Sequence, residues 1–329
     1  MIKEDLISLD SPATWKQTID GIKHSFGHTW ENCYAMHLTT GLKTYLYSFE
    51  NEHGHIVCPI AEREFEGYVD IVKPSGFSGF VGRGSVPGFS FSWRKFAKER
   101  GYICGYIGLN PIFDYSDHFE PQEIYPYINE QCDIYVLDLT PGYDELFANL
   151  SANRKRQLKH WDKIQNDLVF DRSILTDFLL DNYIAFFAEK DALAAFYYDK
   201  STVAFLLSLD NVLIVGARSE GKVVAVSVFT YTADEGEYLF NVSLPEGEHY
   251  GAPLLWHGIN QLKSLHVPIL NLGGGWAGMA EFKRRFGARG LAMKVLKQIY
   301  EPEVYRKFCQ QAKVDSDDMT GYFPAYRRP

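Results

Sequence analysis

Two regions of the chain differ in how their hydrophobic and polar positions alternate. In the first region, short runs of apolar, β-branched and aromatic residues are separated by glycine-containing turns, which predicts β-strands. A predicted helix at Phe91–Arg100, with Gly101 as its C-cap, interrupts these runs. A helix among such strands is typical of an α/β or α+β domain, which we expect to end near Thr140. The predicted strands are Cys33–Leu38, Thr44–Phe49, Ile56–Ile60, Ile103–Gly108 and Cys132–Leu139.

In the second region, helical periodicity comes first and strands follow. The predicted helices are Pro141–Gln165, Phe178–Lys190, Lys200–Leu209, Pro253–Leu265 and Met279–Phe286. The predicted strands are Val212–Ala217, Lys222–Tyr231, Tyr238–Val242, Pro268–Leu272 and Leu291–Ile299, the last completing the second sheet. This order resembles the ground plan of a GNAT acyltransferase domain. We therefore expect an α/β fold with mixed sheets in two tandem GNAT-like domains, residues 1–139 (joined by the tail 301–329) and 140–300.

Composition narrows the class of protein. The length of 329 residues suits two domains, and 46% hydrophobic and 23% charged residues are ordinary for a globular chain. The five cysteines form no CxxC pair, the N-terminus lacks a signal-peptide core, and no apolar run is long enough to span a membrane. A cytoplasmic protein is the expectation. The net charge of −9 argues against a DNA partner, although a local basic groove could still dock RNA.

Several segments, in their order, resemble the Fem family of tandem-GNAT aminoacyltransferases and its acyltransferase relatives. The most specific is Leu272-Gly273-Gly274-Gly275 followed by Ala280–Gly287, which is similar to the family's "LGG…L..FK..FG". Leu150–Lys155, after Leu137–Thr140, resembles a strand followed by a helix with "LS…R". Gly76–Phe80 is similar to a glycine-aromatic turn of the first domain. The segment Ile107–Pro111 resembles an "R.NP" segment, but with Gly108 or Leu109 where the family has arginine.

The resemblance implies an N-acyltransferase that moves an acyl or aminoacyl group onto an amine of a cell-envelope precursor, such as an amino sugar or a peptide. Two donors are open. Acyl-CoA suits the acidic net charge, and aminoacyl-tRNA, as in peptidoglycan-type aminoacyltransferases, suits a basic helix. A third hypothesis is a GNAT-derived binding module that has lost catalysis.

Three residues are candidates for catalysis. Lys283 lies in the FK segment, and the resemblance implies that it neutralises the donor or the developing oxyanion. The alternative is an exposed lysine in a basic helical turn. Asn241, at the end of a strand, could hydrogen-bond the donor carbonyl, and ordinary turn chemistry explains it equally well. Glu281 could serve as a base, but a solvated helix charge is the commoner explanation.

The candidate donor-binding residues follow the third strand of the meander. They are Ser243, Tyr250, Gly251 and Ala252. In GNAT proteins that use acetyl-CoA, a Q/R-x-x-G-x-G/A loop at this place binds pyrophosphate with helix N-terminal amides. Here Gly251 fits that pattern, but Glu246 and Glu248 would repel a pyrophosphate.

The candidate acceptor-binding residues are two basic and two aromatic side chains. Arg154 and Arg156 belong to a predicted basic helical face that could meet phosphates of a lipid-linked or nucleotide-linked acceptor or of tRNA, although most such faces are simply solvated. Tyr198 and Trp276 could line an acceptor groove, and core packing explains them equally well. The histidines and cysteines have no metal-ligand spacing, so we expect no metal.

Overall fold

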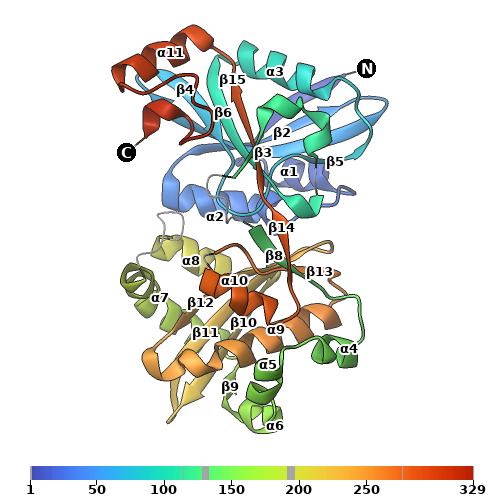
Figure 1. Cartoon of the computed structure of the whole chain (residues 1–329), viewed down its shortest axis with the longest axis vertical. Coiled ribbons are helices and arrows are strands. Elements are labelled where there is room, and N and C mark those ends of the chain that lie inside the picture. The colour runs from blue at the N-terminus through green and yellow to red at the C-terminus, as the bar shows by residue number, and fades with distance from the viewer. Residues whose placement is uncertain (1, 114, 128–132, 191–196, 276, 329) are drawn as a thin grey trace. The chain divides into compact units, whose positions relative to one another are not determined.

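The computed structural model describes residues 2–113, 115–127, 133–190, 197–275 and 277–328. The chain forms two compact units, each with its own mixed β-sheet (Figure 1). Unit 1 comprises Met1–Cys132 and Ala292–Pro329, and unit 2 comprises Asp133–Leu291.

The sheet of unit 1 runs in the order β1-β2-β3-β4-β6-β15-β7, and β5 pairs with β3. The pair β4–β6 is parallel, and the other pairs are antiparallel. The bounds are β1 Lys3–Ser8, β2 Lys43–Glu50, β3 Gly54–Phe65, β4 Tyr68–Val72, β5 Val81–Gly84, β6 Tyr102–Leu109, β7 Ile124–Pro126 and β15 Lys294–Ile299; the helices are α1 Pro12–Ile19, α2 Trp30–Thr40, α3 Phe89–Glu99 and α11 Pro302–Gln311. Short 3₁₀ turns lie at Phe26–His28, Pro111–Phe113, Ser116–His118, Pro121–Glu123 and Ala325–Arg327.

Helix α2 corrects the strand predicted at Cys33–Leu38. The Thr29 side chain accepts a hydrogen bond from the Asn32 amide and so caps the helix, and Gly41 ends it in the left-handed conformation. A short apolar run does not by itself distinguish a buried strand from a buried helix. The capping residues at the two ends, rather than the apolar run between them, determine that this segment is a helix.

Two strands pair with a different sheet from the one expected. β8 (Asp133–Asp138), predicted as the last strand of the first domain, pairs with β13 of unit 2. Conversely, β15 lies within the predicted strand Leu291–Ile299, yet it pairs with β6 and β7 of unit 1. Strand pairing depends on register and buried contacts between distant segments, which the residues of one strand do not specify.

The sheet of unit 2 runs in the order β14-β8-β13-β12-β11-β10-β9. Helix α9 covers one face: its Leu254, Leu255 and Ile259 share a core with Phe229. Helix α7 covers the other face, where Tyr183 lies 5.0 Å from the ring of Phe240. The bounds are β9 Leu168–Val169, β10 Val212–Ser219, β11 Lys222–Tyr231, β12 Gly236–Ser243, β13 Ile269–Asn271 and β14 Arg289–Ala292; the helices are α7 Arg172–Glu189, α8 Lys200–Leu207, α9 Gly251–Ser264 and α10 Ala277–Arg284, with 3₁₀ turns η5 Gln165–Asp167 and η7 Pro245–Tyr250.

The single helix predicted over Pro141–Gln165 is wrong. The segment forms three short helices, α4 (Tyr143–Ala148), α5 (Ala152–Gln157) and α6 (Trp161–Ile164). Ser151 caps α5 by accepting a hydrogen bond from the Arg154 amide. Its own amide donates to the Arg285 carbonyl, so a tertiary contact helps to separate α4 from α5.

In unit 1 a buried histidine fixes the glycine-aromatic turn Gly76–Phe80. The Nδ1 atom of His28 accepts from the Ser25 amide at 3.2 Å, so Nε2 carries the proton and donates to the Gly79 carbonyl at 3.2 Å. Gly79 has a φ of +120°, and a Cβ there would lie 2.6 Å from the Gly108 carbonyl oxygen. The turn therefore requires glycine as well as a neutral imidazole.

Acidification should destabilise unit 1 through His28. Burial lowers the pKa of this imidazole from 6.5 to about 3. The folded state thus remains neutral while the unfolded state takes up a proton, so stability is complete above pH 6.5 and is lost as the pH falls toward 3. We expect a loss of about 1.4 kcal/mol per pH unit in that interval. Hydrogen exchange of residues 76–80 against pH measures it. In His28→Gln this slope should shrink, whereas in His53→Gln, at an exposed site, it should not change.

Candidate functional site

The pairing between β12 and β13 ends soon after it begins. Gly236 pairs with Leu270 and Glu237 with Asn271 in parallel; β13 then ends, while β12 continues to Ser243. We call this point the fork, defined by Glu237, Asn271 and the residues that follow them on each strand. Beyond the fork the register between β12 and β13 ends, and the Gly273 amide donates instead to Asn271 Oδ1 at 2.8 Å.

A β-bulge on β12 lies just past the fork. Val228 pairs with Phe240 and Phe229 with Tyr238, so Leu239 is an extra residue with no partner in the register. A bulge leaves the amide of its extra residue outside the ladder. Leu239 therefore has no register partner on β11, two residues beyond Glu237 of the fork. The sequence analysis missed it, because leucine and tyrosine are ordinary strand residues and give no signal of a bulge.

Lys283 lies on the other side of the fork. Its Nζ donates to the Gly273 carbonyl at 2.9 Å and to the Gly274 carbonyl, and only 6% of the residue is exposed. Two of its three N–H donors thus hold the loop that follows β13, which leaves one for a ligand. Burial lowers the pKa of Lys283 from 10.5 to about 8. The alternative of an exposed lysine is therefore wrong, and the catalytic role of Lys283 stays a prediction.

Tyr135 on β8 orders the cations of α10. Its hydroxyl accepts a hydrogen bond from Arg284 Nη2 at 3.0 Å, and its ring lies 5.1 Å from the Arg284 guanidinium carbon. The ammonium of Lys283 lies 5.9 Å from the centre of the same ring. One aromatic ring thus contacts both cations. No sequence motif pointed to Tyr135.

Buried acidic residues lie on the α7 side of the fork. Glu237 is 5% exposed and pairs across the sheet with Thr230, whose buried hydroxyl has no hydrogen-bond partner among the described residues. Glu235 is 1% exposed and accepts from Asn271 Nδ2 at 3.0 Å. Two buried carboxylates and a buried hydroxyl thus lie beside the fork, where buried polar groups need hydrogen-bond partners. The sequence analysis passed over both glutamates, because they lie between the predicted strands Lys222–Tyr231 and Tyr238–Val242.

The other two proposed catalytic residues lie in settings that favour structural roles. Asn241 is the register partner of Ser227, and its Nδ2 donates to Ser227 Oγ at 2.9 Å and to the Val226 carbonyl at 3.1 Å. Glu281 is exposed on α10 and forms an ion pair with Arg285 at 2.9 Å. An exposed, ion-paired carboxylate is a poor general base at neutral pH.

The proposed donor loop is already helical. Turn η7 leads directly into α9, and the Gly251 amide donates to the Glu248 carbonyl instead of pointing outward. The Tyr250 hydroxyl lies 3.1 Å from Asp167 Oδ2 and 3.2 Å from the Arg218 carbonyl. Ala252 is buried in α9, and Ser243 pairs with Ala225. A helix start whose amides are occupied and whose first turn carries Glu246 and Glu248 is unfavourable for a pyrophosphate.

The proposed acceptor residues are dispersed. Arg154 is buried, with its guanidinium 4.2 Å from the ring of Phe282, so it is not part of an exposed basic face. Burial lowers the pKa of Arg154 to about 10. Arg156 is exposed and donates to Asn153 Oδ1 at 2.7 Å. Tyr198 is 7% exposed and stacks on Tyr183. Trp276 lies outside the described residues.

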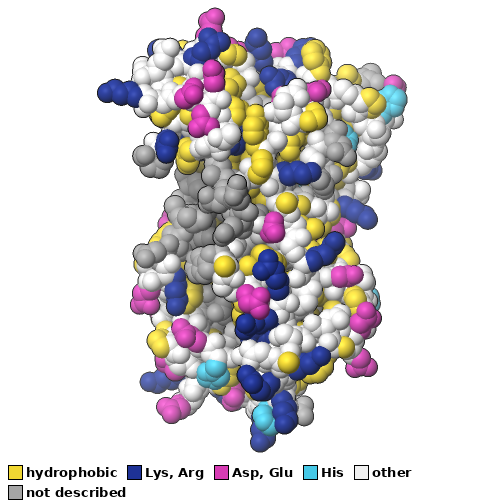
Figure 2. All heavy atoms as spheres, viewed as in Figure 1, with side chains coloured by type: hydrophobic (Ala, Val, Ile, Leu, Met, Phe, Trp, Pro, Cys, Tyr) yellow, Lys and Arg dark blue, Asp and Glu magenta, His cyan; other side chains and the backbone are white. Residues whose placement is uncertain are grey.

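Exposed cations nevertheless gather on one side of unit 2. Figure 2 shows Lys and Arg side chains over α5, α6 and α10. The exposed basic residues of these elements and of β14 are Arg156, Lys159, Lys163, Arg284 and Arg289. Among the described residues, no group of three His, Cys, Asp or Glu side chains could hold a metal ion. None of the described helices is long and apolar enough to cross a lipid bilayer. The cytoplasmic location stays a prediction.

Comparison with known proteins identifies the fold. No protein-family model and no curated protein sequence matches the chain. Solved structures do match it along most of its length, and at 10–12% identity they show its fold. The chain has, in particular, the Fem-like tandem GNAT fold: FemX superposes with a TM-score of 0.67 at 10% identity, over 93% of this chain and 99% of that one. The predicted fold class is thereby confirmed.

Two further structures have the same arrangement. A conserved protein of unknown function from Bacteroides thetaiotaomicron has a TM-score of 0.61 at 12% identity, over 91% of this chain and all of that one. The L-PGS of Bacillus licheniformis has a TM-score of 0.53 at 12% identity, over 87% and 91% of the two chains. At such identities the likeness extends to the fold alone.

Proposed function

We propose that unit 2 is an acyltransferase that moves an acyl or aminoacyl group from an activated donor to an amine at the fork. The observation that carries this proposal is the buried ammonium of Lys283, held against the loop that follows β13; we assign the bulge amide of Leu239, on the neighbouring strand β12, as the second donor. Acyl transfer to an amine develops negative charge on the carbonyl oxygen, and fixed donors stabilise it best where water is excluded.

Each step is assigned to a residue of the fork. The amine nitrogen attacks the donor carbonyl carbon, and the Leu239 N–H and Lys283 stabilise the resulting oxyanion. Glu237 accepts the proton that the attacking amine loses, in place of the exposed Glu281. When the tetrahedral intermediate collapses, the bond to the leaving group breaks and the leaving group takes up the proton that Glu237 accepted, which returns Glu237 to its carboxylate form. No covalent intermediate with the enzyme is required, because positioning of the two substrates supplies much of the rate.

Replacing Glu237 with glutamine tests this assignment. The amide keeps the size of the side chain but cannot accept the proton, so we expect kcat to fall by about 10²–10³. The matched control is Glu281→Gln, which should leave kcat nearly unchanged. Equal effects of the two substitutions would contradict the role of Glu237. The measurement is the rate of amide formation, followed by mass spectrometry.

For the donor, aminoacyl-tRNA is favoured over acyl-CoA. The amides at the start of α9 are occupied, and Glu246 and Glu248 would repel a pyrophosphate, while the exposed cations of α5, α6 and α10 suit a polyanion. As the acceptor we propose an amine of a cell-envelope precursor carried by a peptide, sugar or lipid. The Fem-like fold and the likeness to L-PGS support this choice.

A titration with each donor decides between them. A ligand at about 100 times its Kd adds about 2.7 kcal/mol of stability, which raises the Tm by several degrees. We expect a saturable shift with charged tRNA that weakens as salt rises, and none with acetyl-CoA or longer acyl-CoAs. A saturable shift with an acyl-CoA would instead make coenzyme A the donor. No transfer of any acyl group to any envelope-type amine would favour the third hypothesis, a binding module without catalysis.

A further inference from the structure

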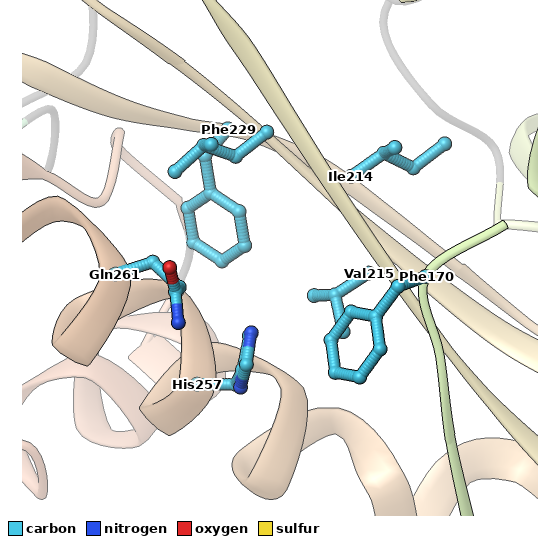
Figure 3. A pocket seen from close by; sticks show the side chains of 8 residues that line it. Phe170, Ile214, Val215, Phe229, His257 and Gln261 are labelled. Atoms are coloured by element: carbon cyan, nitrogen blue, oxygen red, sulfur yellow. The ribbon is translucent and has the colours of Figure 1, made fainter. Parts of the chain in front are cut away.

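A cavity separate from the fork lies between α9 and the sheet of unit 2. Its volume is about 240 Å³, and it is bounded by β10, β11, α9 and the residue after β9. The apolar lining includes Leu213, Val215 and Phe229. Figure 3 shows His257 and Gln261 projecting from α9, with Phe170 and Val215 across from them. The walls are thus apolar, with two polar groups on one helix.

Phe170 is an exposed apolar residue of this lining. It is 57% exposed although it lies at an apolar cavity, and its ring is 5.1 Å from the His257 ring. Ring surface left in water at the edge of a cavity is surface that a ligand can cover. The floor is well fixed, because the Phe229 ring stacks on Tyr238 at 5.0 Å and packs against Gly258, where a Cβ would lie 2.2 Å from it.

The two polar side chains are available to a ligand. No described residue forms a hydrogen bond with the side chain of His257 or Gln261. They are four positions apart on α9 and therefore lie on the same face of the helix. Burial lowers the pKa of His257, so the imidazole is neutral and offers one donor and one acceptor.

The volume of the cavity and its uncharged lining limit which ligands it can bind. An apolar cavity of about 150 Å³ is enough to bind benzene, so about 240 Å³ accommodates one ring with a substituent. The lining carries no charged side chain, and a charged ligand would lose its hydration without compensation. We propose that this cavity binds a small neutral aromatic molecule whose hydroxyl or amide group hydrogen-bonds His257 and Gln261.

This proposal does not rest on the proposed function. The cavity faces the α9 side of β10 and β11, whereas the fork is formed by β12 and β13. Loss of binding here would leave the assignment of Lys283 and Glu237 untouched.

The test uses phenol as the probe and benzylammonium as its charged counterpart. Binding is followed by thermal shift and by the His257 imidazole NMR signal, which is assigned by its absence in His257→Gln. We expect a saturable change with phenol and none with benzylammonium. Gln261→Trp, an exposed change that fills the cavity from its rim, should weaken phenol binding about tenfold or more. Ser264→Trp adds the same side chain one turn away, outside the lining, and should bind phenol as the wild type does.

Two results would overturn the proposal. The first is that phenol produces no saturable change in the full-length protein. The second is that Gln261→Trp and Ser264→Trp bind phenol equally well, which would place the interaction elsewhere. Equal binding of phenol and benzylammonium would likewise contradict a neutral cavity.

Discussion

Replacing Lys283 by methionine should lower kcat/KM for acyl transfer by about 10²–10³, the usual cost of losing one fixed donor to an oxyanion. Methionine has a similar length and no charge, so it packs in the same space but donates no hydrogen bond. The substitution removes the ammonium that contacts Gly273 and Gly274, and with it the donor left for the substrate. The matched control is Lys222→Met, at an exposed position outside the basic residues of α5, α6, α10 and β14, which should retain full activity.

A second readout separates catalysis by Lys283 from mere support of the loop. With its pKa lowered to about 8, the ammonium loses its proton above that pH, so the rate in the wild type should fall on the alkaline side of pH 8. Lys283→Met should not show this decrease in rate above pH 8. If Lys283 only supported the loop, its replacement would lower activity evenly at every pH, and the variant would keep the alkaline decrease in rate. Full activity of Lys283→Met would contradict the proposed mechanism.

Replacing Asp70 by alanine should destabilise unit 1 by about 3–5 kcal/mol, the cost of breaking a buried ion pair on one side. Asp70 is fully buried and accepts hydrogen bonds from Arg63 Nε at 2.7 Å, Arg327 Nε at 2.6 Å and the Tyr326 hydroxyl at 2.8 Å. Arg63 is on β3 and the other two residues are on the C-terminal tail, so one carboxylate joins the tail to the sheet.

The expected consequence is local as well as global. Without Asp70 two guanidinium groups stay partly buried with no anion, and the tail should lose its protection against hydrogen exchange before the remainder of the unit. Hydrogen exchange detected by mass spectrometry measures this for each unit separately. The control is Glu99→Ala, which removes an exposed i,i+4 pair with Lys95 and should cost only about 0.3–0.5 kcal/mol. Wild-type protection of residues 324–328 in Asp70→Ala would show that apolar packing alone holds the tail.

The sequence was most informative where a local pattern and a local contact coincide. The three strands of the β10–β12 meander, the helix at α9 and the helix at α10 were all predictable, because their periodicity and their turn residues agree. Lys283 could be predicted as well, since it belongs to a motif of neighbouring residues that follow a strand and three glycines. Its burial could not, because that depends on where the glycine loop folds relative to α10.

The sequence-based predictions failed where a strand or side chain contacts a partner that lies far away in the sequence. β15 pairs with β6, about 190 positions earlier in the sequence, and nothing within β15 specifies that partner. Arg154 looked like one of several cations on a helix, yet it packs on Phe282, from another helix. Thr230 was predicted as a strand residue and Glu237 lay just outside the next predicted strand, and only the register sets them opposite each other.

The sequence by itself therefore determined the fold class, an α/β fold with mixed sheets of GNAT type, and it placed a lysine in a glycine-rich context. The tertiary structure alone decided which groups meet at the fork, because the bulge at Leu239, the register of Glu237 and the two carbonyls around Lys283 all arise from pairings between separate strands and loops. The physical reason is that periodicity and capping are read within a few neighbouring residues. Burial and strand register depend on contacts that exist only once the chain has folded.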